Sequence, residues 1–459
     1  MPLAHPKPNR RQVFAAGTAW MAAAHSSAAA KPLQPNPIQQ TIAGWHQWGG
    51  PDRNFHFPEQ SRRTSWNRRS PLQRGWQAEL GRGQASVVAT DDDVDSVHLD
   101  GDAEVLTCRS LRGGSIRWQH RTKIAYHAAT AAYDGPHSTP CLAGSSIVSA
   151  TIDAQVHAVD RVSGKRRWIR NLGQQFGTQL PQSGYAASPL VFDDKVILPT
   201  LGVPQEEETE KYRPGSPTAK RGDDESNGLI PGAVALDLAT GRTRWRTPHF
   251  RSSHASTSVA VIAGKPTLLF HGMFELVGVD PDTGVILWRH LLRPDASDNV
   301  AFTPLWSPND QLVLISHGYC SRGAQAIKIS RTGDNWTTRQ AWQNPQLRLV
   351  HSNGVLAGDT FLGVNSVGAE LAVGVDIRTG QTRFRKRCVV ANLLVADQRH
   401  VLGLDRKGRM FMVRLEANDW DEIWSQEIFD STCWSPPSIL GNRVLSRDDR
   451  QLRVDVFGD

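Results

Sequence analysis

One pattern of eleven residues recurs along the chain and strongly restricts the folds available to it. It reads Ala-x-Asp-x-x-x-Gly-x-x-x-Trp and describes a short apolar strand, a tight turn and a second strand that ends in an aromatic residue. A sequence motif that recurs every few tens of residues predicts a repeat architecture. The clearest copies lie at Asp160, Gly164 and Trp168; Asp237, Gly241 and Trp245; Asp280, Gly284 and Trp288; and Asp376, Gly380 and Phe384.

Two weaker copies extend the series. A degraded copy ends at Trp118, and a copy that is one residue longer ends at Trp336. Each copy is preceded, by about twenty to twenty-five residues, by a Ser, Thr or Asn that opens an apolar run. Alternating segments between these landmarks give four short antiparallel strands per unit, which is the composition of a β-propeller blade. The opening residues are Ser86, Ser138, Ser188, Ser256, Thr303, Ser352, Asn392 and Ser435.

The count of these openings predicts an all-β propeller with eight blades over residues 76–459. The seventh unit uses Trp424 as its outer landmark, whereas the eighth unit ends at Leu452–Asp455 without an outer Trp strand. An orphan strand around Trp76 precedes the first unit. We therefore expect Trp76 to complete the eighth blade, so that the first and last segments close the ring and leave no open sheet edge.

The conserved spacing within one copy has a physical reason. The turn needs a residue that tolerates left-handed backbone, which explains the Gly. The Trp offers a large rigid face, and we expect it to pack one blade against the next.

The first thirty residues read as an export signal and lie outside the predicted fold. The pair Arg10-Arg11 precedes an uncharged run over 15–24 and small residues up to Ala30, which indicates a signal peptide of the twin-arginine type. No Cys lies near this point, so no lipid anchor is expected, and no other segment is long and apolar enough to span a membrane. Residues 31–75 read as an extended lead-in that lies along the ring.

The charge and the cysteines exclude several classes of site. The net charge is +7, but the basic residues are scattered beside the turns, and no nucleic-acid motif accompanies them. Five Cys without CxxC spacing argue against a zinc or redox site. If an exported chain of this kind forms a disulfide, the best-placed pair is Cys388 and Cys433.

The working face is predicted from the lengths of the loops. The connections from Trp118 to Ser138 and from Trp168 to Ser188 are long, and an insertion over Gly202–Gly232 falls on the same face. We expect the long loops there and the residues near the axis to form a candidate binding face. The spacing of its His residues matches no metal motif, so hydrogen-bonded anchors of the loops are favoured over metal ligands. Its members are His127, Tyr133, His137, Tyr185, His254 and His351.

The repeat resembles that of the PQQ-like propeller family, which includes quinoprotein dehydrogenases and BamB-like assembly proteins. The opening Trp45-His-Gln-Trp48-Gly-Gly-Pro51 is similar to the start of secreted bacterial members. The resemblance implies an eight-bladed propeller and, for the dehydrogenases, adjacent cysteines, a bound calcium and a catalytic Asp. No adjacent Cys pair is present here, and the calcium ligands and the Asp fall on no matching positions. We therefore predict neither PQQ nor Ca²⁺ as a cofactor, and no catalytic residue.

These observations favour an exported, periplasmic or secreted, monomeric propeller that is not an enzyme and binds a protein partner in the cell envelope. Two alternatives stay open. The first is a PQQ-dependent oxidoreductase, which would show a calcium and quinone site in the channel. The second is a propeller that binds a carbohydrate or another small ligand, which would show a pocket lined by aromatic residues.

Overall fold

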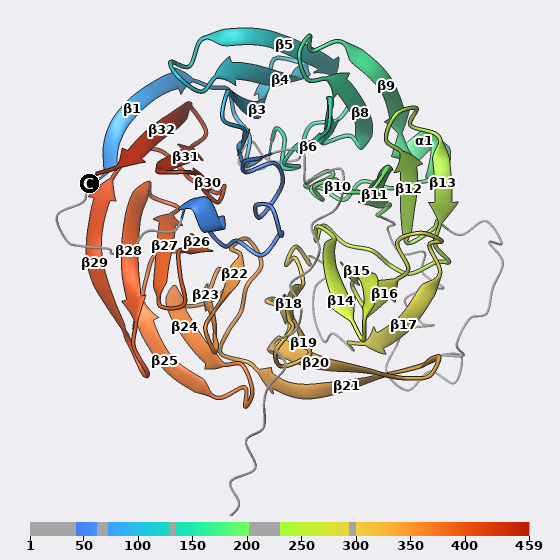
Figure 1. The fold of residues 1–459 in the computed structure, drawn as a ribbon, viewed down its shortest axis with the longest axis vertical. Coiled ribbons are helices and arrows are strands. Elements are labelled where there is room, and N and C mark those ends of the chain that lie inside the picture. The colour runs from blue at the N-terminus through green and yellow to red at the C-terminus, as the bar shows by residue number, and fades with distance from the viewer. Residues whose placement is uncertain (1–42, 62–71, 129–133, 202–229, 293–299, 459) are drawn as a thin grey trace, which may run out of the picture. The chain divides into compact units, whose positions relative to one another are not determined.

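The computed structural model describes residues 43–61, 72–128, 134–201, 230–292 and 300–458, all within one compact unit over 33–459. Eight antiparallel sheets of four strands surround a central axis (Figure 1). The predicted all-β propeller with eight blades is thereby confirmed. No helix in the described ranges has the length and apolar character needed to cross a membrane.

The blades follow one another in chain order, and each runs from its inner to its outer strand. Blades 1 to 4 consist of β2 (Val88–Ala89), β3 (Asp93–Asp100), β4 (Ala103–Ser110) and β5 (Ile116–Lys123); β6 (Cys141–Ala143), β7 (Ser146–Ala150), β8 (Gln155–Asp160) and β9 (Arg166–Asn171); β10 (Leu190–Phe192), β11 (Lys195–Pro199), β12 (Ala233–Asp237) and β13 (Thr243–Arg246); β14 (Ser258–Ile262), β15 (Lys265–His271), β16 (Glu275–Val279) and β17 (Ile286–Leu291). Blades 5 to 8 consist of β18 (Leu305–Ser307), β19 (Leu312–His317), β20 (Gly323–Thr332) and β21 (Asn335–Asn344); β22 (Gly354–Ala357), β23 (Thr360–Val364), β24 (Leu371–Asp376) and β25 (Thr382–Arg387); β26 (Ala391–Val395), β27 (His400–Asp405), β28 (Arg409–Leu415) and β29 (Trp420–Glu427); β30 (Ser438–Leu440), β31 (Arg443–Arg447), β32 (Gln451–Phe457) and β1 (Leu72–Glu79). A short helix α1 spans Leu172–Phe176, and a 3-10 helix spans Glu59–Ser61.

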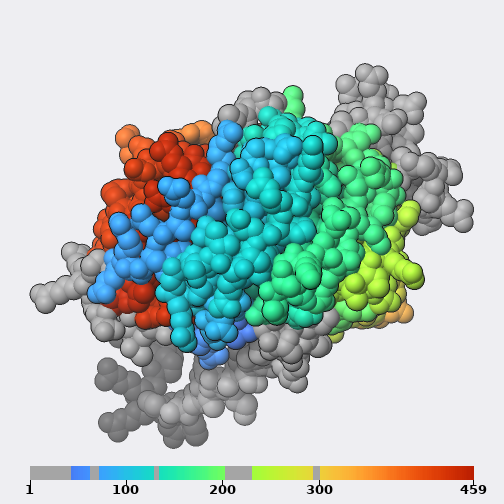
Figure 2. Space-filling model, turned by 90° about the horizontal axis from the view of Figure 1, so that it is seen from above, coloured from blue at the N-terminus to red at the C-terminus, as the bar shows by residue number. Residues whose placement is uncertain are grey.

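The ring closes as the sequence predicts. Strand β1 pairs antiparallel with β32, and Trp76 lies opposite Val454. Figure 2 shows the N-terminal strand in blue directly against the red C-terminal blade. The first strand of the ring therefore completes the last blade, and no sheet edge is left open between them.

Neighbouring blades are joined by an indole that covers a glycine turn. Trp168 of blade 2 is buried, and its Nε1 donates to the carbonyl of Leu238 in blade 3 at 2.8 Å. Gly241 of the same turn has a φ of +67°, and a Cβ added to it would lie 2.7 Å from the Trp168 ring. Glycine is required twice here, for the left-handed backbone and for the close approach of the ring. The same contact is made by Trp76 with Gly114, Trp118 with Gly164, and Trp245 with Gly284.

The Asp of each copy shapes the turn from within. Asp160 Oδ1 accepts hydrogen bonds from the backbone N–H and the hydroxyl of Ser163, both at 2.9 Å. Arg167 Nη2 donates to Asp160 Oδ2 at 2.6 Å, and this hydrogen bond is the main reason that the pKa of Asp160 lies below its usual value. Equivalent bonds from a Thr one residue before the Gly are made to Asp237, Asp280 and Asp376.

The assignment of Trp336 in blade 5 is wrong. Strands β20 and β21 are ten residues each, so the hairpin extends beyond the usual turn and the docking position shifts along the chain. Trp342 occupies it, since its Nε1 donates to the Ile377 carbonyl at 2.6 Å and its side chain packs on Gly380. Trp336 lies further out on the hairpin, where its ring faces the Arg331 guanidinium at 5.5 Å.

The remaining predicted docking residues lie at blade junctions that lack the standard turn. Trp288 and Trp424 are buried, but the Nε1 of each has no hydrogen-bond acceptor in the part of the chain described. Trp288 precedes the blade with the long hairpin, and Trp424 precedes the blade that is closed by β32 and β1. Phe384 carries no ring donor and instead packs against Trp420, with ring centroids 6.2 Å apart.

Residues 43–61 of the lead-in cross the axis of the ring. The sequence led us to expect that the lead-in would instead lie along the ring. We call residues 43–61 the axial plug, and Figure 1 shows this blue segment in the centre of the ring. Its hydrogen bonds reach five blades. The carbonyls of Trp45 and His46 accept from the backbone N–H groups of Ala89 and Leu142, and Trp48 Nε1 donates to Thr303 Oγ1. Arg53 donates to the carbonyls of Ser188 and Pro189, and the backbone N–H of Phe57 donates to the Val395 carbonyl. The aromatic residues Trp45, Phe55 and Phe57, in a segment without a repeat, were the available signal of burial, and our prediction for the lead-in did not use it.

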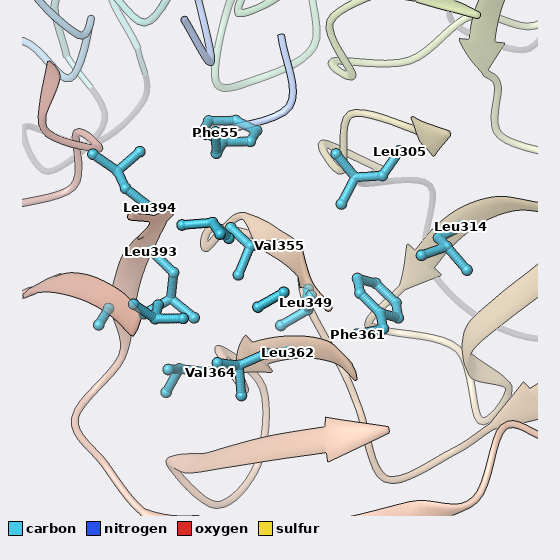
Figure 3. Close-up of a cluster of buried hydrophobic side chains, with 14 of the residues drawn as sticks. Phe55, Leu305, Leu314, Leu349, Val355, Phe361, Leu362, Val364, Leu393 and Leu394 are labelled. Atoms are coloured by element: carbon cyan, nitrogen blue, oxygen red, sulfur yellow. The ribbon is translucent and has the colours of Figure 1, made fainter. Parts of the chain in front are cut away.

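Apolar packing fixes the plug against blades 5 to 7. Phe55 and Phe57 are 1% exposed and belong to the largest hydrophobic cluster. In Figure 3 the Phe55 ring lies beside Val355 and Leu394, which come from the inner strands β22 and β26. Burying side chains of this size contributes about 2–3 kcal/mol each, so the plug is an integral part of the core.

Two histidines lie together between blades 1 and 2, of which His157 is buried and His120 is partly exposed. His157 is 3% exposed, and neither ring nitrogen has a partner among the described residues. Its ring lies 5.2 Å from that of His120. Burial, reinforced by His120 and Arg166, lowers the pKa of His157 to about 3, so the imidazole is neutral at pH 7.

The indole contact can be tested at Gly241. We expect Gly241→Ala to lower the free energy of unfolding by about 3 kcal/mol, because the left-handed backbone is strained and the new methyl group meets the Trp168 ring. Gly264, with a φ of +78° and nothing within 4 Å of an added Cβ, is the matched control. Gly264→Ala should cost only about 1 kcal/mol from backbone strain. Equal losses in chemical denaturation would contradict the docking role.

The axial plug can be tested at Arg53, which is 2% exposed. Its guanidinium donates to the carbonyls of Pro189 at 2.9 Å and Ser188 at 3.2 Å. Arg53→Ala leaves both carbonyls without this donor and should lower the free energy of unfolding by about 2–4 kcal/mol. Arg112→Ala, at an exposed position, should change it by less than about 0.5 kcal/mol. An Arg53 variant as stable as the Arg112 variant would show that the plug is dispensable.

Acid should destabilise the protein through His157. Because its folded-state pKa of about 3 is below the unfolded value of 6.5, stability is full above pH 6.5 and falls as pH drops toward 3. This one group should cost about 2 kcal/mol between pH 7 and pH 5. His157→Gln should remove that part of the pH dependence, measured by denaturation at both pH values. His127→Gln, at an exposed position, serves as the control, and an unchanged pH dependence in His157→Gln would refute the assignment.

Candidate functional site

A cavity of about 830 Å³ lies on the propeller axis. The axial plug contributes Trp48 and Phe55 to its lining, while the starts of inner strands and the connections around them supply the remainder. The connections join one blade to the next or join second to third strands, so they mark the face that the sequence predicted as the working face. We call this the loop face, and its residues at the cavity are Gln179–Ser183, Arg251–His254, Met273, Tyr319 and Val350–His351.

Three of the six candidate residues meet at this cavity. His137, His254 and His351 all line it, and each side chain is partly exposed. His254 Nε2 lies 3.3 Å from the hydroxyl of Ser183, which ties two loops together.

Two of the other three candidates, Tyr185 and His127, are not among the described lining residues. Tyr185 is fully buried, and its hydroxyl donates to the Pro199 carbonyl at 2.9 Å, so it acts as a structural anchor. His127 is exposed, and its Nδ1 lies 3.2 Å from Asp134 Oδ1. Tyr133 lies outside the described residues, as does the insertion over 202–229.

Sequence reasoning missed an aromatic wall on one side of the cavity. Tyr319 hydroxyl lies 3.2 Å from His351 Nε2, and the two rings meet nearly edge to face at 6.4 Å. The ring of Trp434 lies 6.0 Å from that of His351. Burial lowers the pKa of His351, which keeps the imidazole neutral at pH 7. Tyr319 and Trp434 follow no docking spacing, and that irregular placement was the available signal.

The hydroxyl and amide groups at the starts of the inner strands form hydrogen bonds around the axis. We call these groups the inner belt. Thr139 N donates to Ser188 Oγ at 3.0 Å, and Ser188 N donates to Ser256 Oγ at 2.9 Å, so each step links one blade to the next. These groups fasten the crowded ends of the strands. Further links run from Ser86 to Thr139, from Ser258 to Pro304, from Asn353 to Asn392, from Asn392 to Trp434, and from Ser86 to Pro436.

The described lining does not fit a calcium site. Calcium takes six to eight oxygen ligands, with carboxylates prominent among them. No Asp or Glu occurs among the described lining residues, and the amide oxygens of Asn353 and Asn392 already accept backbone N–H groups. Nowhere in the described ranges do three or more His, Cys, Asp or Glu side chains gather in a way that could hold a metal.

The proposed disulfide does not form. Cys388 and Cys433 are both free, as are Cys108, Cys141 and Cys320. Four of the five are buried, and Cys388 is partly buried, so they act as small core residues.

Comparisons with known proteins agree with this architecture. A family profile described as outer membrane protein assembly factor BamB matches residues 101–386. The structure of BamB from Moraxella catarrhalis has a TM-score of 0.55 and 16% identity, covering 84% of this chain and 98% of that one. The structure of the quinohemoprotein alcohol dehydrogenase from Comamonas testosteroni has a TM-score of 0.50 and 14% identity, and the match covers 91% of this chain and 82% of that one. The structure of the computationally designed Ika8 protein has a TM-score of 0.52 and 11% identity, and the match covers 84% of this chain and 99% of that one.

At these identities the solved structures establish the fold alone, since one propeller architecture hosts many activities. No curated protein matches the chain significantly. The family profile, in contrast, covers more than half of the chain. The chain therefore belongs to the BamB family of PQQ-like repeat β-propellers.

Proposed function

We propose that this protein is an exported, non-catalytic propeller that binds a protein partner in the cell envelope through its loop face. The observation that carries the proposal is the inner belt. The polar groups at the starts of the inner strands hold neighbouring blades together, as in the pairs Thr139 with Ser188 and Ser188 with Ser256, and are therefore engaged in structure. The matching family is described as an outer membrane protein assembly factor, which supports a protein partner in the envelope.

The loop face also has the preformed character that suits a partner surface. Tyr126, in the connection from blade 1 to blade 2, donates its hydroxyl toward the carbonyls of Pro181 and Gln182 in the next connection, at 2.9 and 2.8 Å. Helix α1 in that connection is capped by Asn171 and ended by Gly177 with a φ of 75°. Two long loops are thus held to one another, and a surface fixed in this way binds with little reorganisation.

The oxidoreductase alternative has less support. The family implies calcium and PQQ for its dehydrogenases, but the described lining offers no carboxylate that could hold the ion or act as the catalytic Asp. The export signal expected over residues 1–30, which lie outside the described residues, is the basis for proposing a location in the periplasm or outside the cell. We propose a monomer with no nucleic-acid partner.

The partner surface can be tested by site-specific photo-cross-linking in cells that express the full chain. A photoreactive residue in place of Gln182, which is exposed on the loop face, should give one discrete cross-linked protein. The same residue in place of Val162, which is 86% exposed in an Asp…Gly turn at the opposite end of the blade, should give none. Cross-links of equal yield at both positions, or none at Gln182, would contradict the proposed surface.

A second experiment distinguishes the scaffold function from an enzymatic function. The purified protein is mixed with PQQ and CaCl₂ and followed by visible absorbance and calorimetry. We expect no stoichiometric uptake. Uptake of one equivalent of PQQ would contradict the scaffold function and support the oxidoreductase alternative.

A further inference from the structure

The lining of the axial cavity combines partly exposed aromatic rings with neutral polar groups. Binding a protein partner on the loop face does not require this combination. We propose that it is a binding site for a neutral saccharide, such as a short oligosaccharide. This inference does not rest on a protein partner, because the cavity is formed within one chain. Its volume of about 830 Å³ lies within the range of small-molecule sites.

The first support is the aromatic surface that the cavity presents. Trp434, Tyr319 and His351 are only partly buried, although Ser352 and Ser435 beside them are buried. Trp48 of the axial plug is partly buried as well, and its ring lies edge-on to Phe55 at 5.4 Å. Partly exposed rings in a concave site offer apolar faces on which the C–H faces of a sugar ring can stack.

The second support is the supply of neutral hydrogen-bonding groups. Gln179 and Gln182 are exposed at the cavity, and a side-chain amide both donates and accepts. Trp434 lines the cavity with a partly exposed side chain, and its indole Nε1 is a hydrogen-bond donor. A polyhydroxylated ligand matches groups that donate and accept from several sides.

The third support is the charge of the lining. Without an Asp or Glu among the described lining residues, a cationic ligand finds no counter-charge. Arg251 is the one lining residue with a permanent charge in the described ranges, but it is only 6% exposed and its guanidinium lies 5.2 Å from the Phe274 ring centroid. It is therefore poorly placed to receive an anion. An uncharged ligand satisfies both constraints.

The proposal is tested by calorimetric titration of the full chain with maltose, cellobiose and chitobiose, and with glucose 6-phosphate as an anionic probe. We expect at least one neutral disaccharide to bind saturably and glucose 6-phosphate to bind more weakly. Trp434→Ala should weaken the binding by about fivefold or more, and Trp434→Phe should restore most of it. Gln182→Ala, at an exposed position that does not endanger folding, should weaken it about threefold.

Trp336→Ala is the matched control, because Trp336 lies on the outer hairpin of blade 5 and not at the cavity. It should leave the affinity unchanged. The proposal is overturned if no neutral disaccharide binds to the folded protein, if only glucose 6-phosphate binds, or if Trp336→Ala weakens binding as much as Trp434→Ala does. Each result is independent of the cross-linking at Gln182, so failure of one proposal leaves the other standing.

Discussion

The contact on which the ring depends is an indole laid over a left-handed glycine of the next blade. It combines burial of a large rigid surface with one hydrogen bond from the ring nitrogen to a turn carbonyl, as Trp168 makes with Leu238. Because the glycine lacks a side chain, the two blades approach to a distance that no other residue permits at Gly241. The Asp of the same turn fixes the loop that supplies that glycine. At five of the eight blade junctions, one blade thus presents an indole ring and the next presents the glycine turn that receives it.

Inside this outer set of contacts, two further layers hold the blades together. The inner belt links strand starts around the axis, and the axial plug fills the space where eight inner strands converge. Residues such as Trp48 and Phe55 therefore serve the core and at the same time shape the cavity. The site and the scaffold are built from the same segment, so changes to the plug are expected to alter both.

Most of the fold was predictable from the sequence, because the repeat carries its own register. The number of blades and the closure by Trp76 follow from counting landmarks. Trp336 was misassigned because a longer hairpin shifts the docking position to Trp342 without changing the local pattern. The plug was missed because it contains no repeat, and its burial depends on contacts with distant blades. The aromatic wall of Tyr319 and Trp434 was missed for the same reason, since residues far apart in the chain converge there.

The pairing of β1 with β32 also determines when the chain can finish folding. Its partners, such as Trp76 and Val454, lie near opposite ends of the sequence, so their contact closes a very long loop. Contacts within a blade are local and can form early, whereas this one requires that nearly the whole chain be available. Strand β1 therefore waits without its partner strand until β32 is made, when synthesis is almost complete, and during that interval its backbone groups are open to pairing with other chains.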